Sequence, residues 1–339
     1  MKLKLVLLSG VLALFSMTLA VAQGNVSIGV RGGATIPGFT GGQGDPVSEG
    51  YSTALRMGAG IFAEFKISEL FSIQPMLEYS QQGAKRNGMQ AMVATASNPQ
   101  LAGAFQQVGG QMSTQINQAI QDNLGPLASL VPPVSVSVPV PDYLYANAKR
   151  DAKMDYLMLP VLAKFGWNLG KTSPWRVYVD AGPYIGLLLN AKNIVSINGS
   201  VSADKAGNPL VPSSVIMDAI TNAIPSSMLP MIPSDMLSQI TAGATQASQS
   251  LSDEMASNLS GNQDIKDQLN KLNWGLEGNI GLQYKINPRN KVFIEVGGNY
   301  GLMNIQKSTG TDANGKKQYL NGKNNIGAAT AMIGYAYTL

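Results

Sequence analysis

Apolar and polar residues alternate along several stretches of this chain. In the stretch WGLEGNIGLQYKI, residues 274–286, Trp274, Ile280 and the other even-numbered positions are apolar or small. The odd-numbered positions between them, such as Glu277 and Lys285, are polar or small. Side chains of a strand point alternately to its two faces, so this period of two predicts a strand with one apolar face.

The same alternation predicts eight strands, at residues 25–35, 54–66, 70–82, 154–166, 175–192, 272–286, 291–305 and 325–339. Short connections at 67–69, 167–174 and 287–290 alternate with long ones at 36–53, 83–153, 193–271 and 306–324. Short turns at one end and long loops at the other are typical of an up-and-down transmembrane barrel. We therefore expect an all-β fold over residues 23–339. It is an eight-stranded antiparallel β-barrel with large, partly helical extracellular insertions at 83–153 and 193–271.

Aromatic residues gather near both ends of the predicted strands. Those near the short turns are Phe65, Phe71, Trp167, Trp175 and Tyr284, and those near the long loops are Tyr79, Trp274 and Tyr300. Two such girdles flanking an apolar band suit the two interfaces of a bilayer. A soluble lipocalin-like barrel or a sandwich is the alternative, but charged residues form only 13% of the chain, too few to cover a surface in water. The apolar face is therefore expected to meet lipid.

The N-terminus has the pattern of a secretory leader. Lys2 and Lys4 precede an apolar run, and Ala20-Val21-Ala22 forms a small-residue cleavage site, so residues 1–22 are expected to be a signal peptide. A membrane anchor is the alternative, but the apolar run is short for a spanning helix. The expected location is the outer membrane of a Gram-negative cell, with both termini in the periplasm. The small net charge of +4 does not indicate binding to nucleic acid.

Charged residues recur on the predicted inner face of the barrel. This expected charge network comprises Arg31, Arg56, Glu64, Lys66, Glu78, Lys164, Arg176, Asp180, Glu277, Lys285 and Glu295. Eight strands enclose a space that side chains alone can fill, and unpaired charges there are unfavourable. We expect interlocked ion pairs, with Arg176 as one candidate partner of Glu295. An ion or proton path is the functional alternative.

The composition argues against catalysis. The chain contains no His and no Cys, so no Ser can be activated by an imidazole and no metal set of the His/Cys type is available. Outer-membrane proteases, esterases and lipid A deacylases resemble one another in using a His. No dense carboxylate cluster suggests calcium, and no phosphate-binding loop is present. The prediction is a protein without enzymatic activity, cofactor or metal.

The two largest insertions carry apolar residues at helical spacing. Steps of three and four predict amphipathic helices through Phe105, Val108, Met112, Ile116 and Ile120, through Ile216, Ile220 and Ile224, and through Met255 and Leu259. The last pattern continues through Ile265, Leu269 and Leu272. The stretches VPPVSVSVPVPDY and IPSSMLPMIPSDM contain prolines that favour extended chain or turns. We expect the helices to pack together as a cap. Whether this cap merely covers the barrel mouth or binds a partner stays open.

Three of the predicted strands carry a family resemblance. The stretches YLMLPVLAKFGW (156–167), DAGPYIGLLL (180–189) and VFIEVGGNYGLMNI (292–305) resemble the PorT-like outer-membrane β-barrel proteins common in Bacteroidetes. The resemblance implies an outer-membrane barrel and a part in a secretion or envelope complex. The chain departs from the family in its ending, Tyr337-Thr338-Leu339, and in its larger insertions.

Three functions are compatible with these patterns. The first is a non-enzymatic barrel that presents its loop cap for binding or adhesion, because surface loops on rigid scaffolds are where binding usually resides. The second is an assembly component that works through envelope partners. The third is a narrow pore for small solutes. The expected partners are outer-membrane lipid, the barrel assembly machinery and an extracellular or envelope protein, and the barrel itself is expected to be monomeric.

Overall fold

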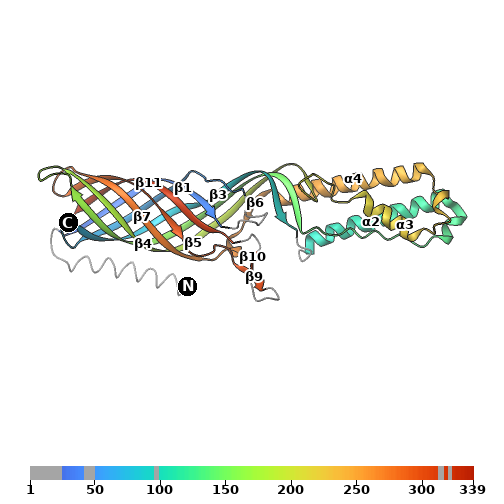
Figure 1. Cartoon of the computed structure of the whole chain (residues 1–339), viewed down its shortest axis with the longest axis horizontal. Coiled ribbons are helices and arrows are strands. Elements are labelled where there is room, and N and C mark those ends of the chain that lie inside the picture. Colours follow the sequence, from blue (N-terminus) through green and yellow to red (C-terminus); the bar gives the residue numbers. More distant parts are fainter. Residues whose placement is uncertain (1–24, 42–49, 95–98, 312–316, 320–322) are drawn as a thin grey trace.

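A computed structural model describes residues 25–41, 50–94, 99–311, 317–319 and 323–339. The predicted signal peptide, residues 1–22, lies outside the described residues. The molecule is elongated, with a barrel at one end and helices at the other (Figure 1).

Eight antiparallel strands form the barrel, as predicted. They are β1 (Val26–Thr40), β2 (Arg56–Lys66), β3 (Phe71–Val93), β4 (Tyr143–Asn168), β5 (Trp175–Ser202), β7 (Leu272–Lys285), β8 (Asn290–Gly301) and β11 (Asn325–Thr338). Each strand pairs with its neighbours along the chain, and pairing of β1 with β11 closes the ring. Closure leaves no unpaired strand edge, which a structure in lipid requires.

The two faces of the barrel strands differ as the alternation predicts. On β7, Ile280 is 58% exposed on the outside, whereas Glu277 is 5% exposed and Asn279 is also buried inside. Exposed apolar side chains continue around the ring at positions such as Ile294 and Ile333. Such a large apolar surface is unfavourable in water, so the outer face is the lipid-facing one.

Three strands run well past the rim of the barrel. Residues 83–93 of β3, 143–153 of β4 and the end of β5 up to Ser202 continue as a paired sheet, here named the extension. The insertions expected at 83–153 and 193–271 therefore start or end as strand, and their non-strand portions are shorter. The prediction missed these segments because they are rich in Gly, Ala, Asn, Lys and Arg, a composition typical of loops.

A group of helices, here named the head (residues 94, 99–142 and 203–260), stands beyond the extension. It contains α2 (Pro99–Leu124), α3 (Ser213–Ala223) and α4 (Ser234–Leu259), with the short 3-10 helices Gly125–Leu130 and Leu229–Met231. The helices predicted through Phe105, Ile216 and Met255 are confirmed in type and place. They project away from the barrel mouth rather than covering it (Figure 1). None of the helices in the described part of the chain is long and apolar enough to cross a membrane.

One predicted helical segment is wrong. Residues 261–272 form the short strand β6 (Gly261–Asp264), a 3-10 turn at Lys266–Gln268 and the start of β7. β6 pairs with β5 through residues such as Lys192 and Asp264, and this ladder replaces the expected helix. Ile265 and Leu269 instead contact an apolar cluster inside the barrel mouth. A short hairpin, β9 (Ser308–Thr311) with β10 (Lys317–Tyr319), lies in the last long connection.

Candidate functional site

The centre of the barrel interior is organised by one arginine. The guanidinium of Arg31 donates from Nε to Glu78 Oε2 at 2.9 Å and from Nη2 to Glu277 Oε1 at 2.7 Å. Its Nη1 donates to Glu295 Oε1 at 2.6 Å. All four side chains are buried. The planar fork of an arginine offers five donors in fixed directions, so a single cation can hold three carboxylates from three different strands.

Neutral donors complete this cluster. Tyr178 donates its hydroxyl to Glu295 Oε2 at 2.8 Å. Asn279 donates from Nδ2 to Asp180 Oδ1 at 2.8 Å and to Glu277 Oε1 at 3.2 Å. Asp180 Oδ1 is thus held by an amide rather than by a cation, and among the described residues its buried Oδ2 has no hydrogen-bond partner. Within the described residues, no group of three or more Asp or Glu side chains is arranged to hold a metal ion.

A second polar group lies closer to the short turns, at what we name the turn end of the barrel. Lys164 Nζ lies 3.5 Å from Glu64 Oε2 and donates to Gln74 Oε1 at 3.1 Å. The same ammonium stands 3.9 Å from the centre of the Tyr178 ring, a favourable cation–π position. Arg176 donates to the backbone oxygens of Glu69 and Gly166, so Arg176 is not the partner of Glu295. That partner is Arg31.

Three residues of the expected network lie outside it. Lys66 is exposed at the last position of β2, and Lys285 is half-buried at the last position of β7. Arg56, at the first position of β2, forms an ion pair with Asp151 of the extension. All three have the inward parity, but they sit at strand ends, where the barrel wall stops, and only the side chain of Arg56, 9% exposed beside Asp151, is well covered there.

Apolar layers fill the interior on both sides of the Arg31 cluster. Toward the turn end the layer consists of Phe62, Met76, Leu162, Tyr178, Phe293 and Ala336. Toward the extension, Met154, Tyr156, Met158, Tyr184, Leu188 and Ala191 pack against Leu269, Ile305 and Ile326. The interior is therefore a packed core of alternating apolar and ionic layers, as expected for a barrel of eight strands.

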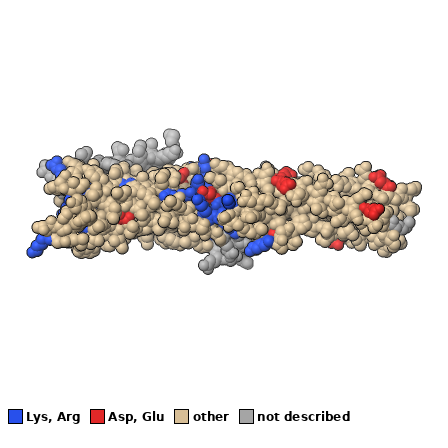
Figure 2. All heavy atoms as spheres, turned by 90° about the horizontal axis from the view of Figure 1, so that it is seen from above, with Lys and Arg blue, Asp and Glu red and all other residues tan. Residues whose placement is uncertain are grey.

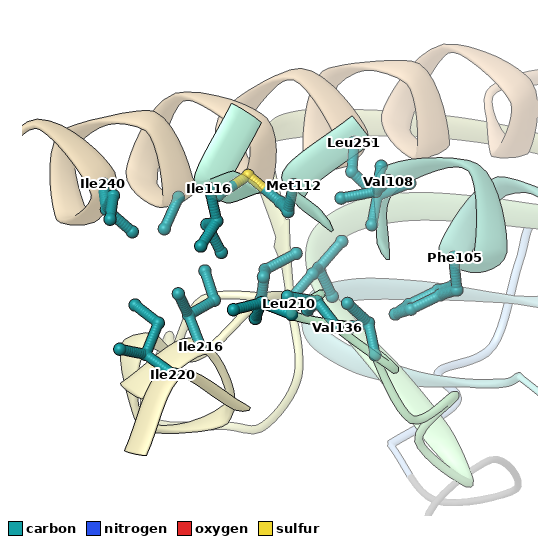
Figure 3. Packing of buried hydrophobic residues seen from close by; sticks show 14 of the residues in the cluster. Phe105, Val108, Met112, Ile116, Val136, Leu210, Ile216, Ile220, Ile240 and Leu251 are labelled. Carbon is teal, nitrogen blue, oxygen red and sulfur yellow. The ribbon is translucent and has the colours of Figure 1, made fainter. Parts of the chain in front are cut away.

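The head has a hydrophobic core of its own. All the apolar residues predicted for the cap contribute to it: Phe105, Val108, Met112, Ile116, Ile120, Ile216, Ile220, Ile224 and Met255 are buried, and Leu259 packs against them partly buried. Figure 3 shows labelled members of this core, among them Met112, Ile116 and Ile216, pointing toward one another between the helices. The core continues into the extension through Met92, Leu144 and Val201, so head and extension are packed together.

An extended proline-rich strap, residues 131–142, lies along α2. Val134, Val136 and Val138 alternate into the head core as they would in a strand. Asn117 holds the strap from both sides, because its Oδ1 accepts from the Val134 amide at 2.8 Å and its Nδ2 donates to the Val134 carbonyl at 2.9 Å. One turn earlier on α2, Ser113 Oγ accepts from the Val136 amide at 2.8 Å.

The strap also needs a glycine beneath it. A Cβ added at Gly109 would stand 2.6 Å from the Val136 carbonyl oxygen. Gly109, Ser113 and Asn117 are spaced by four and form one ridge of α2, so the strap runs along that ridge. Sequence reasoning missed these three residues, although a small or polar ridge beside a proline-rich segment is a readable signal.

The Asn117 clamp gives a measurable expectation. Asn117→Ala should leave the Val134 amide and carbonyl without partners and loosen the strap, destabilising the head locally by about 1–3 kcal/mol. Hydrogen exchange of the strap should accelerate while that of the barrel strands stays unchanged. Asn123→Ala is the matched control, because exposed Asn123 donates only to the Ala119 carbonyl within its own helix. If hydrogen exchange of the strap is equally fast in the two variants, Asn117 does not hold the strap.

A comparison with known protein families identifies the family of this chain. The family described as outer membrane protein beta-barrel domain matches residues 21–307, which is most of the chain. The chain belongs to this family. It is therefore an outer-membrane β-barrel of the Gram-negative type, in agreement with the closed ring and its apolar outer face. No curated protein matches the chain in sequence.

Solved structures with the same kind of fold are distant. Neisserial surface protein A is 10% identical with a TM-score of 0.33, over 92% of this chain and 97% of that one. Ail of Yersinia pestis, solved with the heparin analogue sucrose octasulfate, is 9% identical with a TM-score of 0.29, over 93% and 99%. OprG from Pseudomonas aeruginosa is 8% identical with a TM-score of 0.29, over 94% and 98%. The function of this family member must therefore be argued from its own geometry.

Proposed function

We propose that this protein is a non-enzymatic surface-display barrel whose head binds a macromolecular partner outside the cell. The observation that carries the proposal is the separation of roles within one chain. The barrel interior is filled by ionic and apolar layers. The head has an independent core and stands clear of the barrel (Figure 1).

The proposal includes an orientation. Short turns of outer-membrane barrels face the periplasm and long loops face outward, so the turn end and both termini are assigned to the periplasm. The extension and head then point away from the cell. Eleven residues of β3 at about 3.3 Å each, followed by a 26-residue helix at about 1.5 Å per residue, give a reach of up to about 75 Å. That reach places a binding surface well above the membrane.

The charge of the head restricts the kind of partner that it can bind. Residues 99–142 and 206–263 contain no Lys or Arg, and their acidic residues include Asp122, Asp218, Asp235 and Asp253. On the face that Figure 2 shows, the end of the molecule farthest from the barrel carries acidic but no basic side chains. The rest of the helix surface is rich in Gln, Ser, Thr and Ala. Such a surface favours a neutral or basic protein over a polyanion.

Removal of the head tests the proposal. Residues 95–141 are replaced by a short Gly/Ser turn, since Val93 and Tyr143 are paired strand residues. Residues 203–260 are replaced by a Gly/Ser linker of about eight residues, enough to span from Ser202 back to β6 at about 3.3 Å per residue. The shortened protein should still form a compact, heat-modifiable barrel, because the head contributes no hydrogen bond to the barrel ladder.

The readout is adherence of cells that display the protein to immobilised extracellular-matrix proteins and to one another. We expect the parent to adhere at least about tenfold more than the headless form. Ile116→Asp, which disrupts the head core from a fully buried position, should behave like the headless form. Full adherence by both variants would assign binding to the barrel and refute the proposal.

A PorT-like role in envelope assembly is the second proposal. It is favoured by the resemblance of residues 156–167, 180–189 and 292–305. These segments lie in β4, in β5, and in β8 with the four residues that follow it. In that case the headless form should keep its envelope partners after crosslinking in native membranes. Loss of those partners together with the head would leave only the first proposal.

A further inference from the structure

Exposed lysines collect where the extension leaves the barrel. Lys85 on β3, Lys149 and Lys153 on β4 and Lys192 on β5 are all exposed. Figure 2 shows Lys and Arg side chains gathered midway along the molecule, between an outer barrel wall with few charges and the acidic head. This lysine belt is a feature that display of the head does not require.

Two of these lysines oppose each other directly. Lys153 and Lys192 are ladder partners of β4 and β5, and like charges in that position destabilise a sheet. Lys153 Nζ lies 3.8 Å from Asp151, but that carboxylate is already paired with Arg56. Within the part of the chain that the structure describes, Lys192 makes no ion pair.

Two further carboxylates lie nearby, and both accept hydrogen bonds from neutral donors. Asp155 accepts from the Tyr79 hydroxyl at 2.8 Å and from Asn190 at 3.1 Å. Asp264 is the other ladder neighbour of Lys192, and its Oδ1 accepts from the Lys266 amide at 2.9 Å. Arg56 and the four lysines thus face three carboxylates, Asp151, Asp155 and Asp264, so this region carries an excess of positive charge, which favours an anion from outside.

The belt lies at the height of a lipid headgroup. Phe165, in contact with Phe71, marks the aromatic girdle at the turn end. Lys153 follows twelve positions away on β4, which is about 40 Å along the strand and about 30 Å along the barrel axis at a usual tilt. The hydrocarbon band of such barrels is about 25 Å tall. The polar row of Tyr79, Asp155 and Asn190 lies just below the two lysines, where the lipid-facing wall becomes polar.

We propose that Lys153 and Lys192, flanked by Lys85 and Lys149, bind the phosphate groups of phosphorylated glycolipid in the outer leaflet. A phosphate between the two ammonium groups relieves their repulsion and gains charge-assisted hydrogen bonds. Because the belt sits at the base of the extension, the contact also fixes the angle at which the head leaves the membrane. The inference rests on the outward orientation proposed above.

The test uses the full-length mature protein in zwitterionic detergent, with diphosphorylated lipid A as the probe and its dephosphorylated form as the lipid control. The parent should bind the phosphorylated probe preferentially, with an affinity that falls as NaCl rises. Lys153→Gln/Lys192→Gln should weaken binding roughly five- to thirtyfold. Lys66→Gln/Lys171→Gln removes two exposed lysines at the opposite end and should leave the affinity unchanged.

Several results would overturn the inference. Equal affinity of the two double variants would place the lipid elsewhere. Full competition by inorganic pyrophosphate at equal concentration would make the belt a free-phosphate site rather than a lipid contact. If Lys153→Gln/Lys192→Gln loses its heat-modifiable fold, two other measurements decide: the lipid affinity of Lys153→Arg/Lys192→Arg and the salt dependence of binding by the parent. Salt-independent binding refutes the proposal. Adherence through the head is a separate readout, so failure of lipid binding leaves the proposed function standing.

Discussion

Replacing Arg31 with methionine should strongly destabilise the barrel, or stop its assembly altogether. The variant leaves Glu78, Glu277 and Glu295 buried together without the cation that all three contact. Removing one partner of a buried ion pair costs about 3–5 kcal/mol, and here three carboxylates lose theirs at once. Unfolding by guanidinium in detergent, followed by the gel shift of the heat-modifiable band, measures the loss.

The carboxylates supply the control for Arg31. Combining Arg31→Met with Glu78→Gln, Glu277→Gln and Glu295→Gln removes the unpaired charges and should recover much of the lost stability. Arg289→Met, at an exposed turn, should have little effect. Additive losses in the quadruple variant would show that the four residues do not act as one network.

Placing arginine at Ile280 should produce the second largest loss. Ile280 lies midway along β7 and is 58% exposed on the outer face. A cation facing lipid at mid-bilayer costs roughly 2–4 kcal/mol, whereas the same change in water is nearly neutral. Urea titration of assembly into vesicles, read by gel shift, should reveal a lower folded fraction for Ile280→Arg.

Ser196→Arg is the matched variant for Ile280→Arg. Ser196 on β5 is an exposed strand residue, as Ile280 is on β7. It belongs to the extension, however, beyond the lipid-facing wall. We expect Ser196→Arg to assemble like the parent. Equal tolerance of arginine at both positions would mean that the outer face of β7 does not meet hydrocarbon.

The head shows what helical spacing in a sequence can predict and what it cannot. Steps of three and four through Phe105, Met112 and Ile116 are a local property of the sequence, and the helix forms where they predict it. The direction in which the helices project is not local. It depends on β3, β4 and β5 pairing beyond the rim, in segments whose Gly, Ala and Lys content is typical of a loop.

The candidate residues divide in the same way. Inward parity on the strands placed Arg31, Glu78, Glu277 and Glu295 inside, and all four are buried there. For Lys66, inward parity did not mean burial, because Lys66 is the last residue of β2 and alternation does not show where the barrel wall ends. Asn117 and the lysine belt were missed, since each becomes informative only when a distant segment lies beside it.

The sequence by itself determined the strands of the barrel, their two faces and the helices of the head, because periods of two and of three to four are set by neighbours along the chain. Only the tertiary structure decided which charges meet. Arg31 reaches Glu277 and Glu295, which lie more than two hundred positions away, because closure of β1 on β11 brings those strands around it. Register also placed Lys153 beside Lys192. Pairing across a ring is a property of the closed sheet, and no local pattern in the chain encodes it.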